Sequence, residues 1–192
     1  MKIILGSSSK PRKAIMQAQG YQFEVMTPDI DEKAFRDPDI YKVSLAVARA
    51  KAEALLPRIS EPALLITADN VIICDKEVRE KPESEKEARR FLDSYSKGSP
   101  AEVLGALVVC NTLTKKMFDE IVITKVFFGQ IPSEVIDRYV ASRSPFSHAG
   151  GFEIEHDIIK PYITNIEGEI EAVRGLSIVA LTKLLAQARA SK

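Results

Sequence analysis

The sequence contains few of the residues on which several common kinds of site depend. Among its 192 residues there are two cysteines and two histidines. Cys74 and Cys110 lie in separate strand-like apolar stretches without metal-ligand spacing, so we expect buried, reduced thiols rather than a disulfide framework. His148 and His156 also lack partners at metal-binding spacing, and no nucleophile-elbow sequence supports a serine–histidine–aspartate triad. We therefore interpret both histidines as structural or surface residues.

The chain also lacks an excess of charge of either sign. Lys and Arg together number 27, as do Asp and Glu. A neutral molecule has no overall field that attracts nucleic acid or an anionic membrane, so an anion site must be assembled locally. The longest apolar runs, such as VLGALVVC, are too short to span a bilayer, and the apolar run near Met1 is too short for a signal peptide. We expect a cytoplasmic protein with no membrane or nucleic-acid partner.

The chain does contain a mixture of strand and helix patterns along its whole length. Hydrophobic residues make up 45% and charged residues 28% of the sequence, as in ordinary globular proteins. Alternation or short apolar runs predict strands at 2–5, 21–25 and 63–74, and two more, joined by a polar turn, within 101–128. Helical spacing predicts helices at 11–19, 39–56, 84–95, 131–142 and 176–190.

The remaining stretches are predicted as loops or turns. They are rich in proline, glycine or charged residues, and they cover 27–39, 75–83, 143–157 and 162–168. Ser84, followed by Glu87, and Ser133 are expected to cap the helices that begin beside them. Because the sequence has no internal repeat and no low-complexity linker, we expect one folding unit over residues 1–192, of mixed α/β or α+β class.

The first predicted strand is followed by a hydroxyl-rich, cationic turn, GSSSKPR. A strand-to-helix turn exposes backbone N–H groups at the positive end of the helix, where an anion binds readily. Ser7 and Ser9 can donate hydroxyl protons there, and Arg12 can form paired N–H bonds to a phosphate. The alternative is that the serines cap the helix while the cations are solvated. The turn alone supports both interpretations.

A second group of polar residues lies where the pattern predicts burial or a loop. Asp69 stands between LLITA and NVIIC, and a buried carboxylate is costly unless it is paired or bound to a metal. We therefore take Asp69 as a candidate functional residue. Glu32, in the acidic loop PDIDE, is either solvated or an oxygen ligand for Mg²⁺. Lys51 and Lys81 are individually weak signals, and Gly150 allows either close backbone approach to a ligand or simply a turn.

Taken together and in order, these segments resemble the Maf family of nucleotide pyrophosphatases. The family's Ser-x-Ser-Pro-x-Arg motif corresponds to SSSKPR, with Lys10 in the proline position. The family's acidic loop corresponds to DE, and its helix with a Lys-Ala pair corresponds to ARAKAEAL. Its Ala-Asp-(Thr/Gln)-Val segment then corresponds to TADNVI, and its Lys-Pro turn to KP. HAGGF and IEGEIEAVRGL match the late Ala-Gly loop and the Ile-x-Gly…Val-x-Gly-Leu segment. The matches extend from residue 5 to about residue 185.

The resemblance implies a fold, a reaction and a cofactor. The fold is the mixed α/β fold of Maf and inosine-triphosphate pyrophosphatases, a bent mixed sheet flanked by helices with a deep cleft between two lobes, often in a homodimer. The reaction is hydrolysis of a nucleoside triphosphate between the α and β phosphates to a nucleoside monophosphate and pyrophosphate. The cofactor is a divalent cation, Mg²⁺, with Mn²⁺ or Co²⁺ as alternatives.

By the same match, the implied catalytic set is Asp69, Glu32, Lys51 and Lys81. Glu32 and Asp69 would hold the metal, and Asp69 is also the family's candidate proton acceptor. One carboxylate cannot easily be both a tight metal ligand and a free base, so these two roles of Asp69 stay unresolved. The implied phosphate contacts come from Arg12, from the two lysines and from the serine turn.

Three positions determine substrate specificity in the family, and in this chain they are occupied by Pro11, Asn70 and Glu155. The resemblance also implies that Gly150 and Phe152 contact the substrate. The dTTP/UTP branch carries Arg, Thr and Gln at the three positions, and the 7-methyl-GTP branch carries Trp, Gln and Glu. Glu155 and Phe152 agree with the second branch, and a carboxylate accepts hydrogen bonds from the N1–H and 2-amino groups of guanine. Because Pro11 cannot stack as tryptophan does, a broader activity on modified nucleotides stays an alternative.

Other functions stay open at this point. The same fold could serve as a nucleotide-binding regulator of septum formation without turnover. However, a protein that only binds the nucleotide would gain little from two carboxylates that face a negatively charged triphosphate. An inosine-triphosphate pyrophosphatase would need a different pattern of acidic residues and lysines. A nucleic-acid module would need a basic stripe with interleaved aromatic residues, which the sequence lacks.

Overall fold

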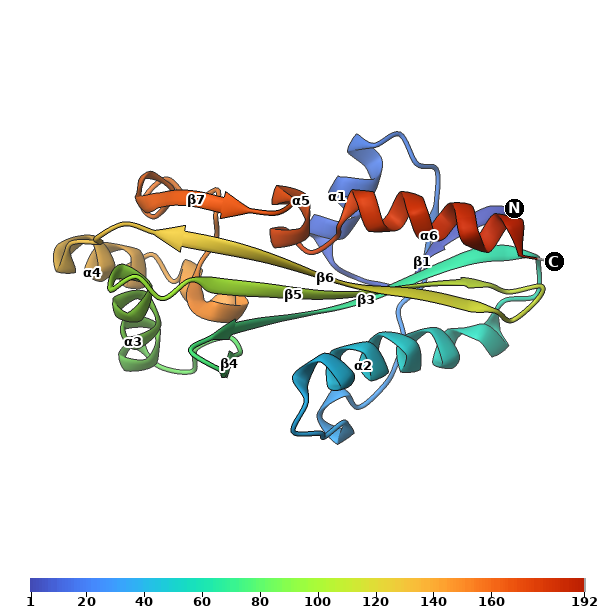
Figure 1. Cartoon of the computed structure of the whole chain (residues 1–192), viewed down its shortest axis with the longest axis horizontal. Helices are drawn as coiled ribbons and strands as arrows, with labels where there is room; N and C mark the ends of the chain where they lie inside the picture. The colour runs from blue at the N-terminus through green and yellow to red at the C-terminus, as the bar shows by residue number, and fades with distance from the viewer. Residues whose placement is uncertain (192) are drawn as a thin grey trace. The chain divides into compact units, whose positions relative to one another are not determined.

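The computed structural model describes residues 1–191, which form a mixed sheet with helices beside it (Figure 1). The strands are β1 (Lys2–Leu5), β2 (Glu24–Val25), β3 (Ala63–Cys74), β4 (Glu77–Arg79), β5 (Ala101–Asn111), β6 (Met117–Phe128) and β7 (Ile163–Glu167). The α-helices are α1 (Lys10–Ala18), α2 (Ile40–Leu55), α3 (Glu85–Ser96), α4 (Ser133–Ala141), α5 (Ile170–Val173) and α6 (Ile178–Ala190). Short 3-10 turns include η1 (Glu32–Ala34) and η4 (Ala149–Gly151).

The seven-stranded sheet has the order β2-β1-β3-β5-β6-β7, and β4 pairs with β3 outside this path. β1 pairs in parallel with β2 and with β3, whereas the pairs β3–β4 and β6–β7 are antiparallel. The mixture of parallel and antiparallel pairs, with helices between the strands in sequence, confirms the predicted mixed α/β class. None of the helices within residues 1–191 has the length and apolar character needed to cross a membrane.

The contacts between residues divide the chain into two compact units. The first contains Met1–Asn70, Gly105–Val122 and the chain from Arg174 onward, and the second contains Val71–Leu104 and Ile123–Val173. Three strands, β3, β5 and β6, contribute residues to both units. The single folding unit expected from the sequence stays a prediction.

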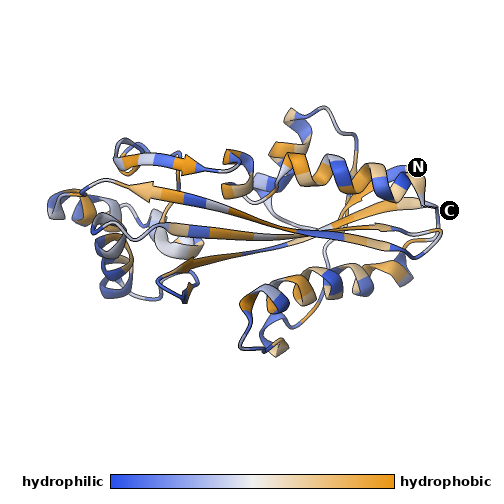
Figure 2. Cartoon of the chain, viewed as in Figure 1, coloured by the Kyte–Doolittle hydropathy of each residue, from blue (hydrophilic) through white to orange (hydrophobic). Residues whose placement is uncertain are grey.

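In the first unit, β1 is buried on both faces. Ile3 and Leu5 pack in one core cluster with residues of α1 and α6, whereas Ile4 packs in another with residues of α2. Ile4 packs on the opposite face from Ile3 and Leu5 because successive side chains of a strand point to opposite faces of the sheet. Figure 1 shows α6 and α2 on opposite sides of these strands, and Figure 2 shows apolar residues along the strands between them. Burial on both faces explains why the apolar run after Lys2 is uninterrupted.

The second unit has its own core, to which its strands, α3 and α4 contribute. Tyr95, Phe128 and Phe152 form its aromatic centre, with ring centroids 5.2, 5.3 and 5.5 Å apart. Tyr95 and Phe128 stack, while Phe152 meets both rings edge-on, which are the favourable arrangements for aromatic pairs. Phe152 is 5% exposed, so its ring belongs to this core.

The helix ends follow the capping rules with one exception. Ser84 Oγ accepts a hydrogen bond from the backbone N–H of Glu87, as predicted, and Asp39 caps α2 in a similar way. Ser133, in contrast, is the first residue of α4, and its N-cap residue Pro132 makes no side-chain hydrogen bond. The prediction of Ser133 as a cap was wrong because the helix begins one residue earlier than a serine cap requires.

Two short strands lie where loops were predicted. β4 occupies the middle of the charged stretch 75–83, and β7 lies within 162–168. β4 has only three residues and β7 is mostly polar, so neither shows the apolar alternation by which strands are found. The predicted strand at 21–25 is reduced to Glu24–Val25, which pairs with the end of β1.

Candidate active site

The turn between β1 and α1 is held by its own serines. Ser9 is the N-cap of α1, and its hydroxyl accepts from the backbone N–H of Arg12 at 3.5 Å. Ser7 Oγ accepts from the backbone N–H of Ser9 at 3.2 Å. Gly6 keeps the turn close to β3: its N–H donates to the carbonyl of Ile66 at 2.7 Å, and a Cβ atom there would lie 2.7 Å from two side chains. Local hydrogen bonding accounts for both serines, and phosphate binding by them stays a prediction.

Arg12 connects three segments of the first unit. Its Nε donates to the carbonyl of Gly175 at 2.9 Å, and its Nη1 donates to the carbonyl of Ala68 at 3.0 Å and to Ser7 Oγ at 3.3 Å. Nη2 donates to Asn70 Oδ1 at 2.6 Å. These bonds engage four of the five N–H groups of a guanidinium. The predicted two-bond fork on a phosphate therefore requires one of these bonds to give way.

Two carboxylates influence this guanidinium. Burial lowers the pKa of Arg12 below its ordinary value, and the negative charges of Asp69 and Glu32 act against that shift. Arginine keeps its proton throughout the physiological pH range. The first unit therefore holds a fixed positive charge close to two acidic residues.

Lys51 joins those two acidic residues. It lies on α2 with 8% exposure, and its Nζ is 3.0 Å from Asp69 Oδ1 and 3.1 Å from Glu32 Oε1. Asp69 comes from β3 and Glu32 from η1, so three segments converge on one ammonium group. A buried lysine is tolerated when carboxylates compensate its charge and accept its protons. The structure thus brings together three of the four residues of the implied catalytic set.

Ser44 completes this cluster, although the sequence pattern did not reveal it. Its Oγ donates to Asp69 Oδ2 at 3.0 Å, and the residue has 0% exposure. The buried face of α2 consists of Ser44, Val47, Ala48, Lys51, Ala52 and Leu55. The apolar positions that predicted this helix were Val43, Ala46, Val47, Ala50 and Ala54. Because alanines lie on several sides of the helix, its apolar stripe is indistinct, and Ser44 was not recognised as part of the buried face.

The other predicted residues belong to the second unit. Lys81 is exposed in the loop between β4 and α3. Gly150 is buried with a φ of 72°, and its N–H donates to the carbonyl of Glu80 at 3.0 Å, so it lies against that same loop. Glu155 is exposed and pairs with Lys160 Nζ at 3.0 Å. Convergence of this group with the cluster in the first unit stays a prediction.

The residues implied in base recognition differ in how accessible they are. Pro11 is exposed in the first turn of α1. Asn70 is half-buried, and its Oδ1 is bound to Arg12, so its Nδ2 is the group left for another partner. Phe152 packs in the aromatic core of the second unit and presents no open ring face to a ligand. Its implied contact with substrate is therefore not a stacking contact.

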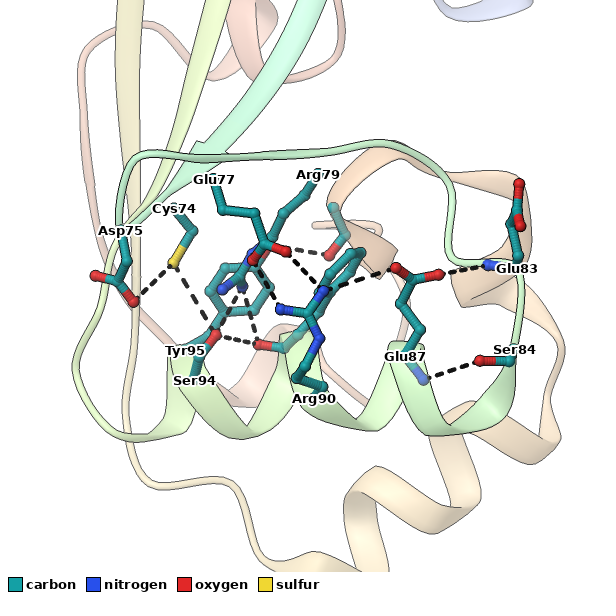
Figure 3. A network of polar contacts seen from close by, with 12 residues as sticks. Cys74, Asp75, Glu77, Arg79, Glu83, Ser84, Glu87, Arg90, Ser94 and Tyr95 are labelled. Carbon is teal, nitrogen blue, oxygen red and sulfur yellow. Dashed lines mark hydrogen bonds and ion pairs between the residues drawn. The ribbon is translucent and has the colours of Figure 1, made fainter.

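A buried arginine fixes the loop that carries Lys81 (Figure 3). Arg79 is the last residue of β4 and is 3% exposed. Its Nη1 donates to Ser94 Oγ at 2.7 Å and to the carbonyl of Phe91 at 3.3 Å, both on α3. Its Nε pairs with Glu77 at 3.3 Å. β4 is thereby anchored to α3 two residues before Lys81.

The residues at Lys51 also bear on the implied metal. Within residues 1–191, no group of three or more His, Cys, Asp or Glu side chains is arranged to hold a metal ion. Glu32 and Asp69 nevertheless direct one oxygen each at the same cation, Lys51 Nζ. Mg²⁺ in nucleotide sites is bound through one or two carboxylates, while water and phosphate oxygens supply its other ligands. The pair fits an ion that arrives with a polyphosphate, not a cage built from protein alone.

We compared the chain with protein families, with curated proteins and with solved structures. The family profile described as "Maf-like protein" matches residues 2–188. A 7-methyl-GTP pyrophosphatase of Dictyostelium discoideum is 38% identical over 192 residues, covering 96% of each chain. A dTTP/UTP pyrophosphatase of Vibrio vulnificus (strain YJ016) is 32% identical over 184 residues, covering 96% of this chain and 97% of the relative. A solved nucleoside-triphosphatase (dITP/XTP pyrophosphatase) of Mycobacterium abscessus has a TM-score of 0.46 and 11% identity, covering 99% of this chain and 96% of that chain.

The chain therefore belongs to the Maf family. The profile covers nearly all of the chain, and the Dictyostelium relative is similar from end to end. The resemblance inferred from the sequence motifs is confirmed. The fold class follows from the chain's own strands and helices, so the weak likeness to the mycobacterial structure is not needed for it.

Proposed function

We propose that the protein is a nucleoside triphosphate pyrophosphatase, which hydrolyses its substrate between the α and β phosphates to a nucleoside monophosphate and pyrophosphate. Membership of the Maf family and the end-to-end similarity to a 7-methyl-GTP pyrophosphatase support this activity. The observation that carries the proposal is the cluster in which Glu32 and Asp69 contact the buried ammonium group of Lys51, and these two carboxylates also act on Arg12 in the same compact unit.

The cluster has the charges that phosphoryl transfer needs. A water that attacks the α-phosphorus must lose a proton, and the negative charge of the phosphate oxygens must be neutralised. Asp69 is the proposed acceptor of that proton. Arg12, Lys51 and Lys81 are the proposed cations for the polyphosphate, with the serine turn as a further donor. The ammonium of Lys51 has three protons and two acidic partners, so one proton is available for a phosphate oxygen.

A divalent cation is part of the proposal, with Mg²⁺ preferred over Mn²⁺ or Co²⁺ and with Glu32 and Asp69 as its ligands. When bound, the ion polarises phosphoryl oxygens and lowers the pKa of water. The chain's contribution is to hold the two carboxylates together, which Lys51 does through its two ion pairs. Asp69 is proposed as proton acceptor as well as ligand, so its two roles need separate measurements.

For the base, we propose guanine in a modified nucleotide such as 7-methyl-GTP. The carboxylate of Glu155 can accept from the N1–H and 2-amino groups of guanine, whereas uracil and thymine present one donor between two acceptors. A methylated, cationic ring is attracted further by the same negative charge. The second candidate is dTTP or UTP, which the 32% identity to the Vibrio relative favours.

Pyrophosphate release across canonical and modified triphosphates tests this proposal. We expect the highest kcat/KM for 7-methyl-GTP or a related purine. In Glu155→Gln, the ranking should move toward pyrimidines by about tenfold, because an amide can also donate to a pyrimidine carbonyl. Asp157→Asn removes an exposed carboxylate two residues away and should leave the ranking unchanged.

Two outcomes contradict parts of the proposal. If no triphosphate releases pyrophosphate, the protein is a binder and the proposed reaction is wrong. If Glu155→Gln keeps the wild-type ranking, Glu155 does not recognise the base.

A cytoplasmic location and a homodimer also belong to the proposal. Cys74 and Cys110 are buried and unpaired, as a reducing compartment permits. The homodimer is inferred from the family alone. Sedimentation equilibrium should give twice the chain mass of 21.3 kDa, and a monomer at micromolar concentration would contradict the dimer.

A further inference from the structure

One helix holds both oxygens of Asp69. Oδ1 lies 3.0 Å from Lys51 Nζ, and Oδ2 accepts from Ser44 Oγ at 3.0 Å. Ser44 and Lys51 are seven residues apart on α2, which is about two helical turns, or about 10 Å of rise. Side chains of a helix lean toward its N-terminus, so the long lysine chain extends back toward Ser44. The two donors converge on one carboxylate for this reason.

Ser44 and Lys51 are the polar members of an otherwise apolar face. The rest of the buried face of α2 is Val47, Ala48, Ala52 and Leu55. A hydroxyl with 0% exposure lowers stability unless it is hydrogen bonded, and the bond of Ser44 is directed to Asp69. Alanine is also more favourable than serine in the interior of a helix. The contact with Asp69, rather than helix formation or packing, therefore accounts for a serine at this position.

Ser44 differs from Lys51 in what it can do for the carboxylate. Lys51 is shared with Glu32, whose side chain is 55% exposed, and its charge sits on a flexible four-carbon stem. Ser44 has a short side chain in a buried place, so its oxygen is fixed relative to the helix.

We propose that Ser44 is the positioning residue for Asp69: its hydroxyl sets the plane of the carboxylate. Asp69 then keeps one orientation when Lys51 and Glu32 change partners to engage a substrate. The catalytic consequence rests on the proposed pyrophosphatase function, whereas the contact itself does not.

Thr67 offers a matched control in the same junction of strand and helix. Its Oγ1 donates to the carbonyl of Ala48 at 2.6 Å, and it also has 0% exposure. Both hydroxyls therefore link β3 to α2, but the bond of Thr67 ends on the main chain. Thr67→Val and Ser44→Ala each remove one of these two buried bonds.

The first measurement does not depend on catalysis. In ¹³C-labelled protein, the side-chain carboxyl resonance of Asp69 is compared at a single pH without nucleotide or metal. We expect Ser44→Ala to move this resonance and Thr67→Val to leave it in place, because only Ser44 donates to the carboxylate. An unchanged resonance in Ser44→Ala overturns the proposal, whatever the activity of the protein.

The second measurement is pyrophosphate release. Ser44→Ala should lower kcat by about tenfold with KM within about twofold, because a misoriented reacting group affects the transition state more than ground-state binding. Its thermal stability should be close to that of the wild type, since alanine favours the helix. Thr67→Val should keep the wild-type kcat.

An unchanged kcat in Ser44→Ala, or an equal loss in both variants, overturns the catalytic role of Ser44. Absence of pyrophosphate release from the wild-type protein instead overturns the proposed function. In that case the Asp69 resonance alone decides whether Ser44 positions the carboxylate.

Discussion

At the scale of single residues, we expect the proposed activity to depend on the charge of Asp69. Asp69→Asn keeps the shape of the side chain but removes the charge that Lys51 neutralises. We expect pyrophosphate release to fall by about 10²–10⁴-fold, the range of general-base contributions, while calorimetry still detects nucleotide binding by the cations. Glu61→Gln, at an exposed carboxylate paired with Lys2, is the control and should keep the wild-type rate. An unchanged rate in Asp69→Asn would refute its proposed role.

At the scale of elements, two arginines of the second unit form a natural comparison (Figure 3). Arg79 and Arg90 both pair with Glu77, at 3.3 and 2.7 Å, and both lie 4.8 Å from the ring centroid of Phe91. Their side chains differ in burial, with 3% of Arg79 and 51% of Arg90 exposed. The comparison therefore sets a buried arginine against an exposed one beside the same carboxylate and the same ring.

Arg79→Ala should lower the free energy of unfolding by about 3 kcal/mol, because it removes a buried group and leaves acceptors on α3 without their donor. Arg90→Ala should cost less than about 1 kcal/mol, as exposed pairs do. Urea denaturation followed by circular dichroism measures both values. Equal losses in the two variants would show that Arg79 does not anchor β4 to α3.

At the scale of the whole molecule, each compact unit contains one cysteine. Cys110 lies in the first unit and Cys74 in the second, and burial raises the pKa of both thiols above their ordinary value of 9.0. Because β3, β5 and β6 contribute to both units, we expect the units to unfold together. A thiol reagent at neutral pH should then label both cysteines slowly and at one rate, measured by mass spectrometry. Faster labelling of either cysteine would show that its unit opens independently.

The raised pKa values of the same thiols predict that the folded protein loses stability at alkaline pH. A raised folded-state pKa contributes stability that is fully present below the unfolded pKa of 9.0 and is lost as the pH rises through the folded pKa. Burial likewise raises the pKa of Tyr139 above 10.0. We expect a thermal midpoint that is constant near neutral pH and falls above about pH 9. A midpoint that stays constant up to pH 11 would contradict this effect.

The sequence predicted the elements best where burial is continuous. The strand expected at 63–74 matches β3 at both ends, and the helix expected at 39–56 differs from α2 by one residue at each end. Burial on both faces gives β3 an apolar run that a loop would not have. β4 and β7 were missed because their stability comes from pairing with distant strands, which leaves little trace in three to five local residues.

Only those residues of the candidate site that belong to a recognisable sequence motif could be predicted. Glu32, Lys51 and Asp69, which the structure brings together, were singled out because each interrupts its surroundings or matches a family segment. Ser44 was missed because its partner, Asp69, lies 25 positions away in the sequence. A serine within a helical pattern does not by itself indicate a buried hydrogen bond. Phe152 was expected as a substrate contact, but its packing against Tyr95 could be recognised only in three dimensions.

The bond between Arg12 and Gly175 has a consequence for how the protein is made. The two residues are 163 positions apart, so the carbonyl that accepts from Arg12 Nε is synthesised long after the guanidinium that it binds. Chains emerge from the ribosome with the N-terminal end first. A nascent chain that already carries Glu32, Lys51 and Asp69 therefore still lacks the carbonyl that holds Arg12, and we expect the proposed nucleotide chemistry to begin only after Gly175 has been synthesised.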